Sequence, residues 1–248
     1  MEMKSWKRII SLSSTDSTNS YAMRLLKSDE VEEGTLVFTQ EQIQGRGLGK
    51  NRWESERNMN LTFSIILFPG FLPVEQHYML SKVISLGLLD YASSKVSGIS
   101  IKWPNDIYYQ DKKLAGILIE NSIKGSVLNY SVAGIGLNLN QEQFVSDAPN
   151  PVSLKQITGI HYHVEDELHL VRQHLKKYYQ KLQSGQMNAI HRRYIESLYR
   201  LNKFHNFRWN NRIFRAKIIG VNEYGHLQVI SSTNEHREFE FKEIEFLI

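Results

Sequence analysis

The sequence predicts a fold that combines helices and strands and ends in a small unit built only of strands. Apolar runs of strand length, such as 35–39 and 61–68, alternate with longer segments that are apolar at helical spacing, such as 164–183. From about residue 204 the helical pattern disappears, and short β-type runs follow one another between turn signals. About 45 residues of short strands can form only a small barrel or sandwich, which we expect to dock on the larger part.

Composition limits the classes of protein that fit. The chain has 248 residues, of which 41% are hydrophobic and 23% are charged, enough for one large domain or for one large and one small. It contains no cysteine, which excludes disulfides, thiolate metal sites and a cysteine nucleophile and is typical of a reducing cytoplasm. The formal net charge of +4 is too small to predict nucleic-acid binding by itself. No apolar run approaches the roughly 20 residues that cross a bilayer.

The first predicted elements are a strand at 6–12 and a helix at 20–27. A cluster of hydroxyl, amide and carboxylate residues lies between them, at 13–19. Such residues favour helix N-termini, and Asp16 or Ser17 can cap this helix. From the residues alone, capping is the simpler interpretation of the cluster. The strand at 35–39 then leads into a loop.

That loop, residues 41–53, combines glycines with basic residues. The glycines occupy alternate positions and the cations lie between and beyond them: Gly45, Gly47 and Gly49, with Arg46, Lys50 and Arg52. A loop of this composition is flexible and can wrap its backbone N–H groups around an anion. It is neither a P-loop nor a dinucleotide fingerprint, because no Gly-Lys-Ser/Thr and no helix follows it. Taken alone, a solvated turn is the simpler interpretation.

The remaining elements follow from the same two periodicities. We expect helices at 74–95, 153–159, 164–183 and 187–199, and further strands at 61–68, 99–101, 117–119, 130–133, 212–219, 227–230 and 238–241. A polar stretch at 109–112 predicts a hairpin turn between the strands at 99–101 and 117–119. The nine histidines are scattered without a metal-ligand spacing, so we predict no tightly bound transition metal.

The most informative stretch is Lys102–Asp106, which reads Lys-Trp-Pro-Asn-Asp, together with Lys113 after the predicted turn. Pro104 fixes its own backbone and favours an extended Trp103, so the chain should leave the strand stiffly. One carboxylate, one amide and two ammonium groups would then converge. Lysine neutralises developing negative charge and aspartate offers Mg²⁺ a hard oxygen, so the set suits an anionic ligand with a divalent cation. For an arbitrary sequence, a surface hairpin with solvated charges would be the simpler interpretation.

This stretch, followed by Lys-Leu-Ala-Gly-Ile-Leu at 113–118, resembles the signature of biotin protein ligases, the biotin–[acetyl-CoA-carboxylase] ligases. The Asp-Ser-Thr-Asn at 16–19 and the Gly-x-Gly-x-Asn at 134–138 are similar to two further motifs of that family. Its glycine loop, of the form Gln-x-x-Gly-Arg-Gly-Arg-x-Gly-Arg-x-Trp, is matched at Gln42, Gly45, Arg46, Gly47 and Trp53. The chain departs from that form at Leu48, Gly49, Lys50 and Asn51. The resemblance is strong from 16 to 140 and loose beyond.

The resemblance implies an α+β fold. Residues 1–203 would form a catalytic biotin- and ATP-binding domain, with a mixed β-sheet flanked by helices as in class II synthetases. Residues 204–248 would form a small C-terminal SH3-like β-barrel. The first motif begins near residue 16, so we expect the form that lacks the N-terminal DNA-binding domain.

The reaction implied by the resemblance has two steps. Biotin is activated with ATP and Mg²⁺ as biotinyl-5′-AMP, and a specific lysine of a biotin carboxyl carrier protein then receives the biotinyl group. No covalent enzyme intermediate is required, in agreement with the absence of cysteine. The enzyme would be cytoplasmic and a possible homodimer, with neither DNA nor a membrane as a partner.

The resemblance also implies roles for individual residues. Lys113 would contact the biotin carboxylate and the α-phosphate, and Arg46 would bind both the carboxylate and the phosphate. Lys102 and Asp106 would bind the phosphates and Mg²⁺, and Asp106 would also be a candidate acceptor for the proton of the incoming lysine. Trp53 would cover the adenylate. Hydroxyl and amide groups can donate to and accept from a cyclic urea, so Ser17, Thr18 and Asn19 would hold the ureido ring. The other predicted binding residues are Gln42, Gly45, Gly47, Leu48, Asn105, Gly116, Gly134 and Asn138.

Two alternatives remain open at this point. A lipoate–protein ligase shares the fold and the adenylate chemistry, although the Ser-Thr-Asn at 17–19 favours biotin. Octanoyl transferases that use a cysteine nucleophile are excluded. The non-enzyme alternative is a nucleic-acid-binding protein that uses the basic loop at 46–52 and the small β unit. Its weakness is that aromatic residues are not interleaved with the cations.

Overall fold

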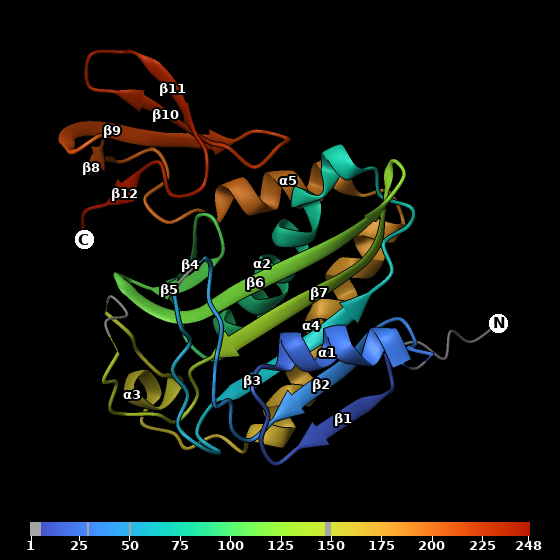
Figure 1. The fold of residues 1–248 in the computed structure, drawn as a ribbon. Coiled ribbons are helices and arrows are strands. Elements are labelled where there is room, and N and C mark those ends of the chain that lie inside the picture. Colours follow the sequence, from blue (N-terminus) through green and yellow to red (C-terminus); the bar gives the residue numbers. More distant parts are fainter. Residues whose placement is uncertain (1–5, 29, 50, 147–149) are drawn as a thin grey trace.

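The computed structural model describes residues 6–28, 30–49, 51–146 and 150–248; Lys50 of the glycine loop lies outside these ranges. Its main sheet has seven strands in the order β1-β2-β3-β7-β6-β5-β4 (Figure 1). The strands are β1 Ile9–Leu12, β2 Thr35–Thr39, β3 Leu61–Leu67, β4 Ile99–Lys102, β5 Asp106–Tyr109, β6 Lys112–Lys124 and β7 Val127–Leu137. β1 pairs with β2 in parallel and the other neighbours pair antiparallel, so the predicted mixed sheet is confirmed.

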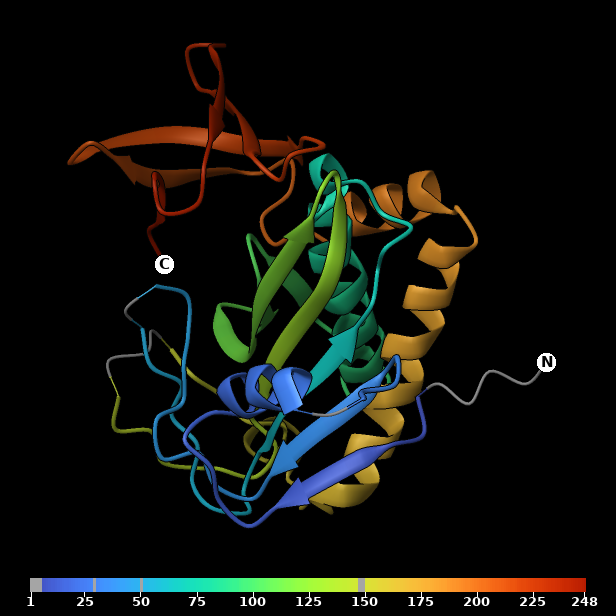
Figure 2. The same cartoon turned by 45° about the vertical axis from the view of Figure 1, so that its right-hand side comes forward.

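Helices cover both faces of this sheet (Figures 1 and 2). The helical elements are α1 Thr18–Ser28, the single turn η1 Val74–Gln76, α2 Tyr78–Ser93, α3 Leu154–Thr158, α4 Val164–Gln183 and α5 Met187–Glu196. α1 packs on β3 and β7 from one side, and α2 and α4 pack together on the other. None of the helices in the described ranges is both long enough and apolar enough to cross a bilayer.

Because both faces are covered, a central strand has no solvent face, and all seven residues of β3 are buried. Successive side chains still alternate between two cores. Ile66 packs with Ala22 and Leu25 of α1, whereas Phe63 and Ile65 belong to the larger core formed with α2 and α4. The continuous apolar run at 61–68 is explained by this double burial.

Two sequence predictions were incomplete. The helix expected at 74–95 is divided, since η1 turns at His77 before α2 begins. The hairpin expected between 99–101 and 117–119 contains an additional strand, β5, whose Ile107 and Tyr108 are fully buried. The Lys102–Asp106 stretch is therefore itself the connection between β4 and β5, and the chain turns again at Gln110 and Asp111 before β6.

A second sheet of five antiparallel strands follows α5, in the order β11-β10-β9-β8-β12. Its strands are β8 Phe204–Trp209, β9 Arg212–Val221, β10 Leu227–Ser231, β11 His236–Phe239 and β12 Glu245–Phe246. The predicted C-terminal unit of strands is therefore confirmed, and the α+β class with it. The division into two domains between residues 203 and 204 stays a prediction. Figure 1 shows the second sheet beside the end of the main sheet that carries β4 and β5.

Candidate active site

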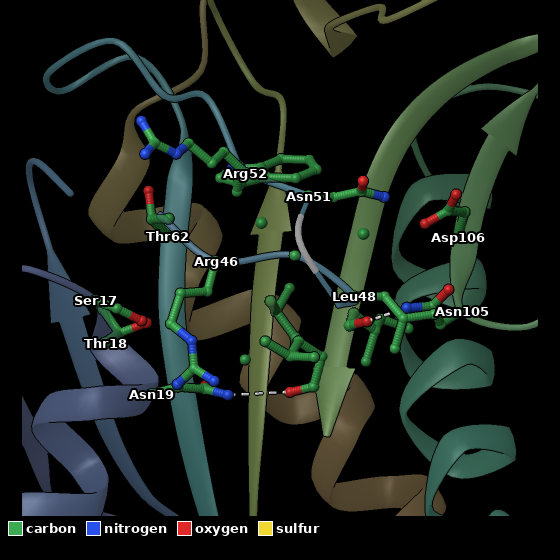
Figure 3. Close-up of a pocket in the computed structure, with 18 of the residues that line it drawn as sticks. Ser17, Thr18, Asn19, Arg46, Leu48, Asn51, Arg52, Thr62, Asn105 and Asp106 are labelled. Carbon is green, nitrogen blue, oxygen red and sulfur yellow. Dashed lines mark hydrogen bonds between the residues drawn. The ribbon is translucent and has the colours of Figure 1, made fainter. Parts of the chain in front are cut away.

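A cavity of about 210 Å³ lies on the main sheet under the glycine loop. Its walls come from the start of α1, the loop at 42–53, the turn at 104–106 and the middle of β6 and β7 (Figure 3). Thirteen of the predicted site residues line it: Ser17, Thr18, Asn19, Gln42, Arg46, Gly47, Leu48, Trp53, Asn105, Asp106, Lys113, Gly116 and Gly134. Residues from five separate parts of the sequence thus meet in one place.

One end of the cavity is a buried network of neutral hydrogen-bonding groups. Gln42 Oε1 accepts from the Thr18 backbone N–H at 2.8 Å and from Thr18 Oγ1 at 3.1 Å. Ser64 Oγ, on β3, lies 2.7 Å from Thr18 Oγ1 and 2.6 Å from Asn19 Oδ1. Ser17, Thr18 and Asn19 are all buried, so their groups are held in fixed orientations. This end suits a small neutral ligand group with both donors and acceptors.

Arg46 reaches across the cavity toward this network (Figure 3). Its guanidinium donates two hydrogen bonds to the carboxylate of Glu120, with Nη2 at 2.9 Å from Oε1 and Nη1 at 3.3 Å from Oε2. Asn19 Nδ2 donates to the same Oε2 at 2.8 Å. Glu120 therefore ties the glycine loop to the start of α1, as a bidentate partner of the arginine.

The opposite end carries an ion pair under an indole ring. Lys113 Nζ lies 2.8 Å from Asp106 Oδ1, and the Lys113 ammonium is 5.7 Å from the ring centroid of Trp53. Trp53 can lie flat here because β7 has a glycine beneath it: a Cβ added to Gly136 would be 2.1 Å from Trp53 Cε2. Asn105 closes the edge by donating its side-chain N–H to the Ile117 carbonyl.

Three predicted residues in the described part of the chain do not line the cavity. Gly45 holds the loop closed, since its carbonyl accepts from the Trp53 N–H at 3.0 Å. Asn138 donates its side-chain N–H to the Val152 carbonyl at 3.1 Å. Lys102 points to aromatic rings, with its ammonium 5.1 Å from the Tyr108 centroid and 4.8 Å from the Phe246 centroid.

Several residues of the site have no signal in the sequence. Thr62 and Ser64 belong to the apolar run of β3, and Glu120 lies two residues after the motif at 113–118, which supplies four residues to the cavity wall. The remaining lining residues that were not predicted are Asn51, Arg52, Pro104, Ile117, Leu118, Ile135 and Gly136. Arg52 belongs to the cationic loop, and the apolar ones were assigned to strands or turns without a ligand role.

No group of three or more His, Cys, Asp or Glu side chains within the described ranges could hold a metal ion. Asp106 is the carboxylate that lines the cavity beside Lys113. Mg²⁺ in nucleotide sites is commonly held by one or two carboxylates together with substrate phosphates. The donor set therefore fits Mg²⁺ only as an ion shared with a nucleotide.

Comparison with known proteins identifies a matching family model and similar sequences among both bifunctional ligase/repressors and biotin–[acetyl-CoA-carboxylase] ligases. Residues 11–138 match the model of the biotin/lipoate A/B protein ligase family. The bifunctional ligase/repressor BirA of Bacillus subtilis is 32% identical over 141 residues, which are 54% of this chain and 42% of that protein. The biotin–[acetyl-CoA-carboxylase] ligase of Paracoccus denitrificans is 34% identical over 157 residues, 60% of this chain and 63% of that one. The chain thus spans about half the length of the curated relatives it matches.

The whole fold is similar to solved structures. The biotin protein ligase of Aquifex aeolicus in complex with biotin and ATP superposes with a TM-score of 0.80 and 25% identity, covering 97% of this chain and 99% of the other. The similarity extends through the second sheet, because nearly all of both chains is included.

Proposed function

The chain belongs to the biotin/lipoate A/B protein ligase family, and from this premise we propose that it is an ATP-dependent biotin–[acetyl-CoA-carboxylase] ligase. In the first step a carboxylate oxygen of biotin attacks the α-phosphorus of ATP. The bond to the β-phosphate oxygen breaks, so that biotinyl-5′-AMP forms and pyrophosphate leaves. In the second step a lysine ε-amine of a biotin carboxyl carrier protein attacks the acyl carbon, and AMP leaves.

The observation that carries this proposal is that uncharged hydroxyl and amide groups line one end of the cavity, while the Lys113 ammonium, paired with Asp106, lies at the other. Ser17, Thr18 and Asn19 offer hydroxyl and amide groups that match the donors and acceptors of a cyclic urea. Lys113 lies at the other end, where a carboxylate attached to the same ligand would meet a phosphate. The dithiolane ring of lipoate has no comparable hydrogen-bonding groups, so the neutral end supports biotin over lipoate.

Lys113 would stabilise the negative charge that develops as carboxylate and phosphate approach each other. Asp106 holds the Lys113 ammonium at 2.8 Å and would hold Mg²⁺ together with the nucleotide phosphates. When bound, that ion would neutralise phosphate charge. Trp53, fixed by its contacts with the glycines of β6 and β7, would cover the adenylate and keep water from it.

Asp106 would have a further role in the second step. An attacking ε-amine must lose a proton, and the Asp106 carboxylate lies at the cavity wall within reach of a group entering beside Lys113. The family resemblance supports a carrier-domain lysine as the acceptor, and the absence of cysteine supports a cytoplasmic location.

The proposal is tested by incubating the purified protein with ATP, Mg²⁺ and either biotin or lipoate and measuring pyrophosphate release. We expect release that depends on biotin, and transfer of biotin to an added biotin carboxyl carrier domain. Release with lipoate alone would identify a lipoate ligase. Release with neither acid, combined with binding to nucleic acid, would support the non-enzyme alternative.

A further inference from the structure

Residues of the second, C-terminal sheet contact the turn at 102–106 on the side away from the cavity. The Lys102 ammonium lies over two ring faces, that of Tyr108 on β5 and that of Phe246 on β12. A cation in this position is attracted by the electron-rich faces of both rings. Burial lowers the pKa of Lys102, and the neighbouring Asp106 carboxylate acts against that shift. Phe246 is fixed in turn by an edge contact with Phe207, at a centroid distance of 5.1 Å.

Trp103 forms a second contact with the same sheet. Its side chain is 3% exposed, and its Nε1–H donates to the Gly225 carbonyl at 2.8 Å. Gly225 lies in the connection between β9 and β10. The indole also packs against Phe241 at a centroid distance of 5.4 Å. A buried hydrogen bond to a main-chain carbonyl fixes the position of the ring as well as its burial.

A third contact with the turn comes from Tyr78 on helix α2. Its hydroxyl donates to the Pro104 carbonyl at 3.3 Å, and its ring packs against Phe241 at 6.0 Å. The fit against Gly225 is close, because a Cβ added there would lie 2.6 Å from Tyr78 Cδ2. The carbonyl that precedes Asn105 is thus held by a residue that itself packs on the second sheet.

The turn therefore has two halves with different surroundings. Lys102 and Trp103 face the second sheet, whereas Asn105 and Asp106 line the cavity, and Pro104 joins them. We propose that Lys102 and Trp103 are positioning residues, through which the second sheet fixes Asn105 and Asp106 in the cavity wall. The inference rests on the proposed function, because the step it would affect is adenylation at the Asp106–Lys113 pair. It also replaces the phosphate contact that the sequence predicts for Lys102.

The test compares two phenylalanines of the second sheet by substituting each with leucine. Phe246 contacts Lys102, whereas Phe214, also half-buried and packed on Phe207, belongs to the part of the sheet formed by β9. In biotin-dependent pyrophosphate release, we expect Phe246→Leu to lower kcat about fivefold, with KM for biotin and ATP unchanged within about twofold. Phe214→Leu should leave kcat near that of the wild type even where both variants lose the same amount of thermal stability.

Substitutions of Lys102 test the same contact from the side of the turn. Lys102→Met should lower kcat as Phe246→Leu does, and the double variant should be no slower than the slower single variant, because both remove the same contact. Lys102→Arg, which keeps a cation over both rings, should restore kcat to within about twofold. A raised KM for ATP in Lys102→Met, together with wild-type kcat in Phe246→Leu, would make Lys102 a phosphate ligand and overturn the proposal.

Hydrogen–deuterium exchange separates a failure of this proposal from a failure of the proposed function. The amides of residues 105–107 should exchange faster in Phe246→Leu than in Phe214→Leu, whatever reaction the protein catalyses. Equal exchange in the two variants would overturn the positioning role. A wild-type protein that releases no pyrophosphate with biotin, but shows the expected difference in exchange, would refute the proposed function and leave the positioning role supported.

Discussion

Lys113 Nζ lies 2.8 Å from Asp106 Oδ1 because a β-bulge changes the face to which Lys113 points. Asp106 is opposite Gly116 in the ladder between β5 and β6, but after the bulge Tyr108 is opposite Lys113. Side chains on paired positions share a face, so the bulge brings Lys113 to the face of Asp106 and Gly116. Regular alternation would have directed Lys113 and Gly116 to opposite faces of the sheet.

The first prediction concerns the charge of Lys113. Lys113→Gln keeps a polar side chain of similar length but removes the cation proposed to meet carboxylate and phosphate. We expect biotin-dependent pyrophosphate release to fall about a hundredfold, the loss that follows removal of one charge-assisted transition-state contact. The matched control is Lys112→Gln, since Lys112 is exposed and adjacent in the sequence. A rate within about threefold of the wild type in Lys113→Gln would remove Lys113 from the reaction.

The Asp106–Lys113 pair illustrates which features of the structure can be predicted from the sequence and which cannot. Most strands and helices follow from periodicity, although β5, β8 and β12 were not predicted. α4 has the predicted bounds, because a long amphipathic stripe is a strong local signal. The convergence of Asp106 with Lys113 was expected from the turn between them. The bulge that completes it was not, because it depends on how β5 pairs with β6 and leaves no residue signature in the chain.

Contacts between segments that are distant in the chain also could not be predicted from the sequence. Ser64 reads as one more small residue in an apolar strand, yet its hydroxyl supports Thr18 and Asn19. Lys102 reads as part of a ligand motif, and its position over Phe246 exists only because the second sheet docks there. Local pattern predicts the elements, whereas tertiary docking decides which side of a turn faces a ligand.

The second prediction uses two glycines of β7 as steric probes of the two ends of the cavity. A Cβ at Gly134 would lie 2.3 Å from Asn19 Oδ1, and a Cβ at Gly136 would lie 2.1 Å from Trp53 Cε2. We expect Gly134→Ala to raise KM for biotin about tenfold, and Gly136→Ala to raise KM for ATP by a similar factor. Steady-state kinetics with each substrate varied in turn would check both.

Gly70→Ala serves as the control for the glycine variants, because the nearest atom to its added Cβ is the Leu128 carbonyl oxygen at 3.9 Å. Its kinetics should match those of the wild type. If Gly134→Ala and Gly136→Ala raise the same KM, the assignment of biotin and nucleotide to opposite ends of the cavity is wrong.

The third prediction concerns Ser64, which lies behind the neutral end of the cavity. Ser64→Ala removes a buried hydroxyl that orients Thr18 and Asn19, at a net cost of about 1 kcal/mol to biotin binding, so KM for biotin should rise about fivefold with kcat nearly unchanged. Ser131→Ala is the matched control, because Ser131 is also fully buried and its Oγ has no hydrogen-bond partner among the described groups. Equal KM values for the two variants would contradict the orienting role.

The fourth prediction is a rise of stability with pH caused by Lys82. The side chain is 1% exposed, and its Nζ lies 2.9 Å from His191 Nδ1. Burial lowers the pKa of Lys82 to about 8, against the weaker opposing effect of Glu223. The folded chain therefore releases this proton at lower pH than the unfolded chain, whose lysine has the ordinary value near 10.5, so the free energy of unfolding rises with pH between about 8 and 10.5.

Urea unfolding at pH about 7.5 and about 9.5 would measure this rise, which we expect to be about 1–2 kcal/mol. This range stays below the ionisation of Tyr78, whose pKa is raised by burial, and above that of His191, whose pKa is lowered by burial and then by Lys82. Lys82→Met keeps the apolar stem but has no proton to lose, so its free energy of unfolding should rise less over the same interval, and only the share of buried Lys102, whose pKa burial also lowers, should remain. Parallel pH dependences in the wild type and Lys82→Met would show that Lys82 is protonated equally in the folded and unfolded chains, contrary to its burial between α2 and α5.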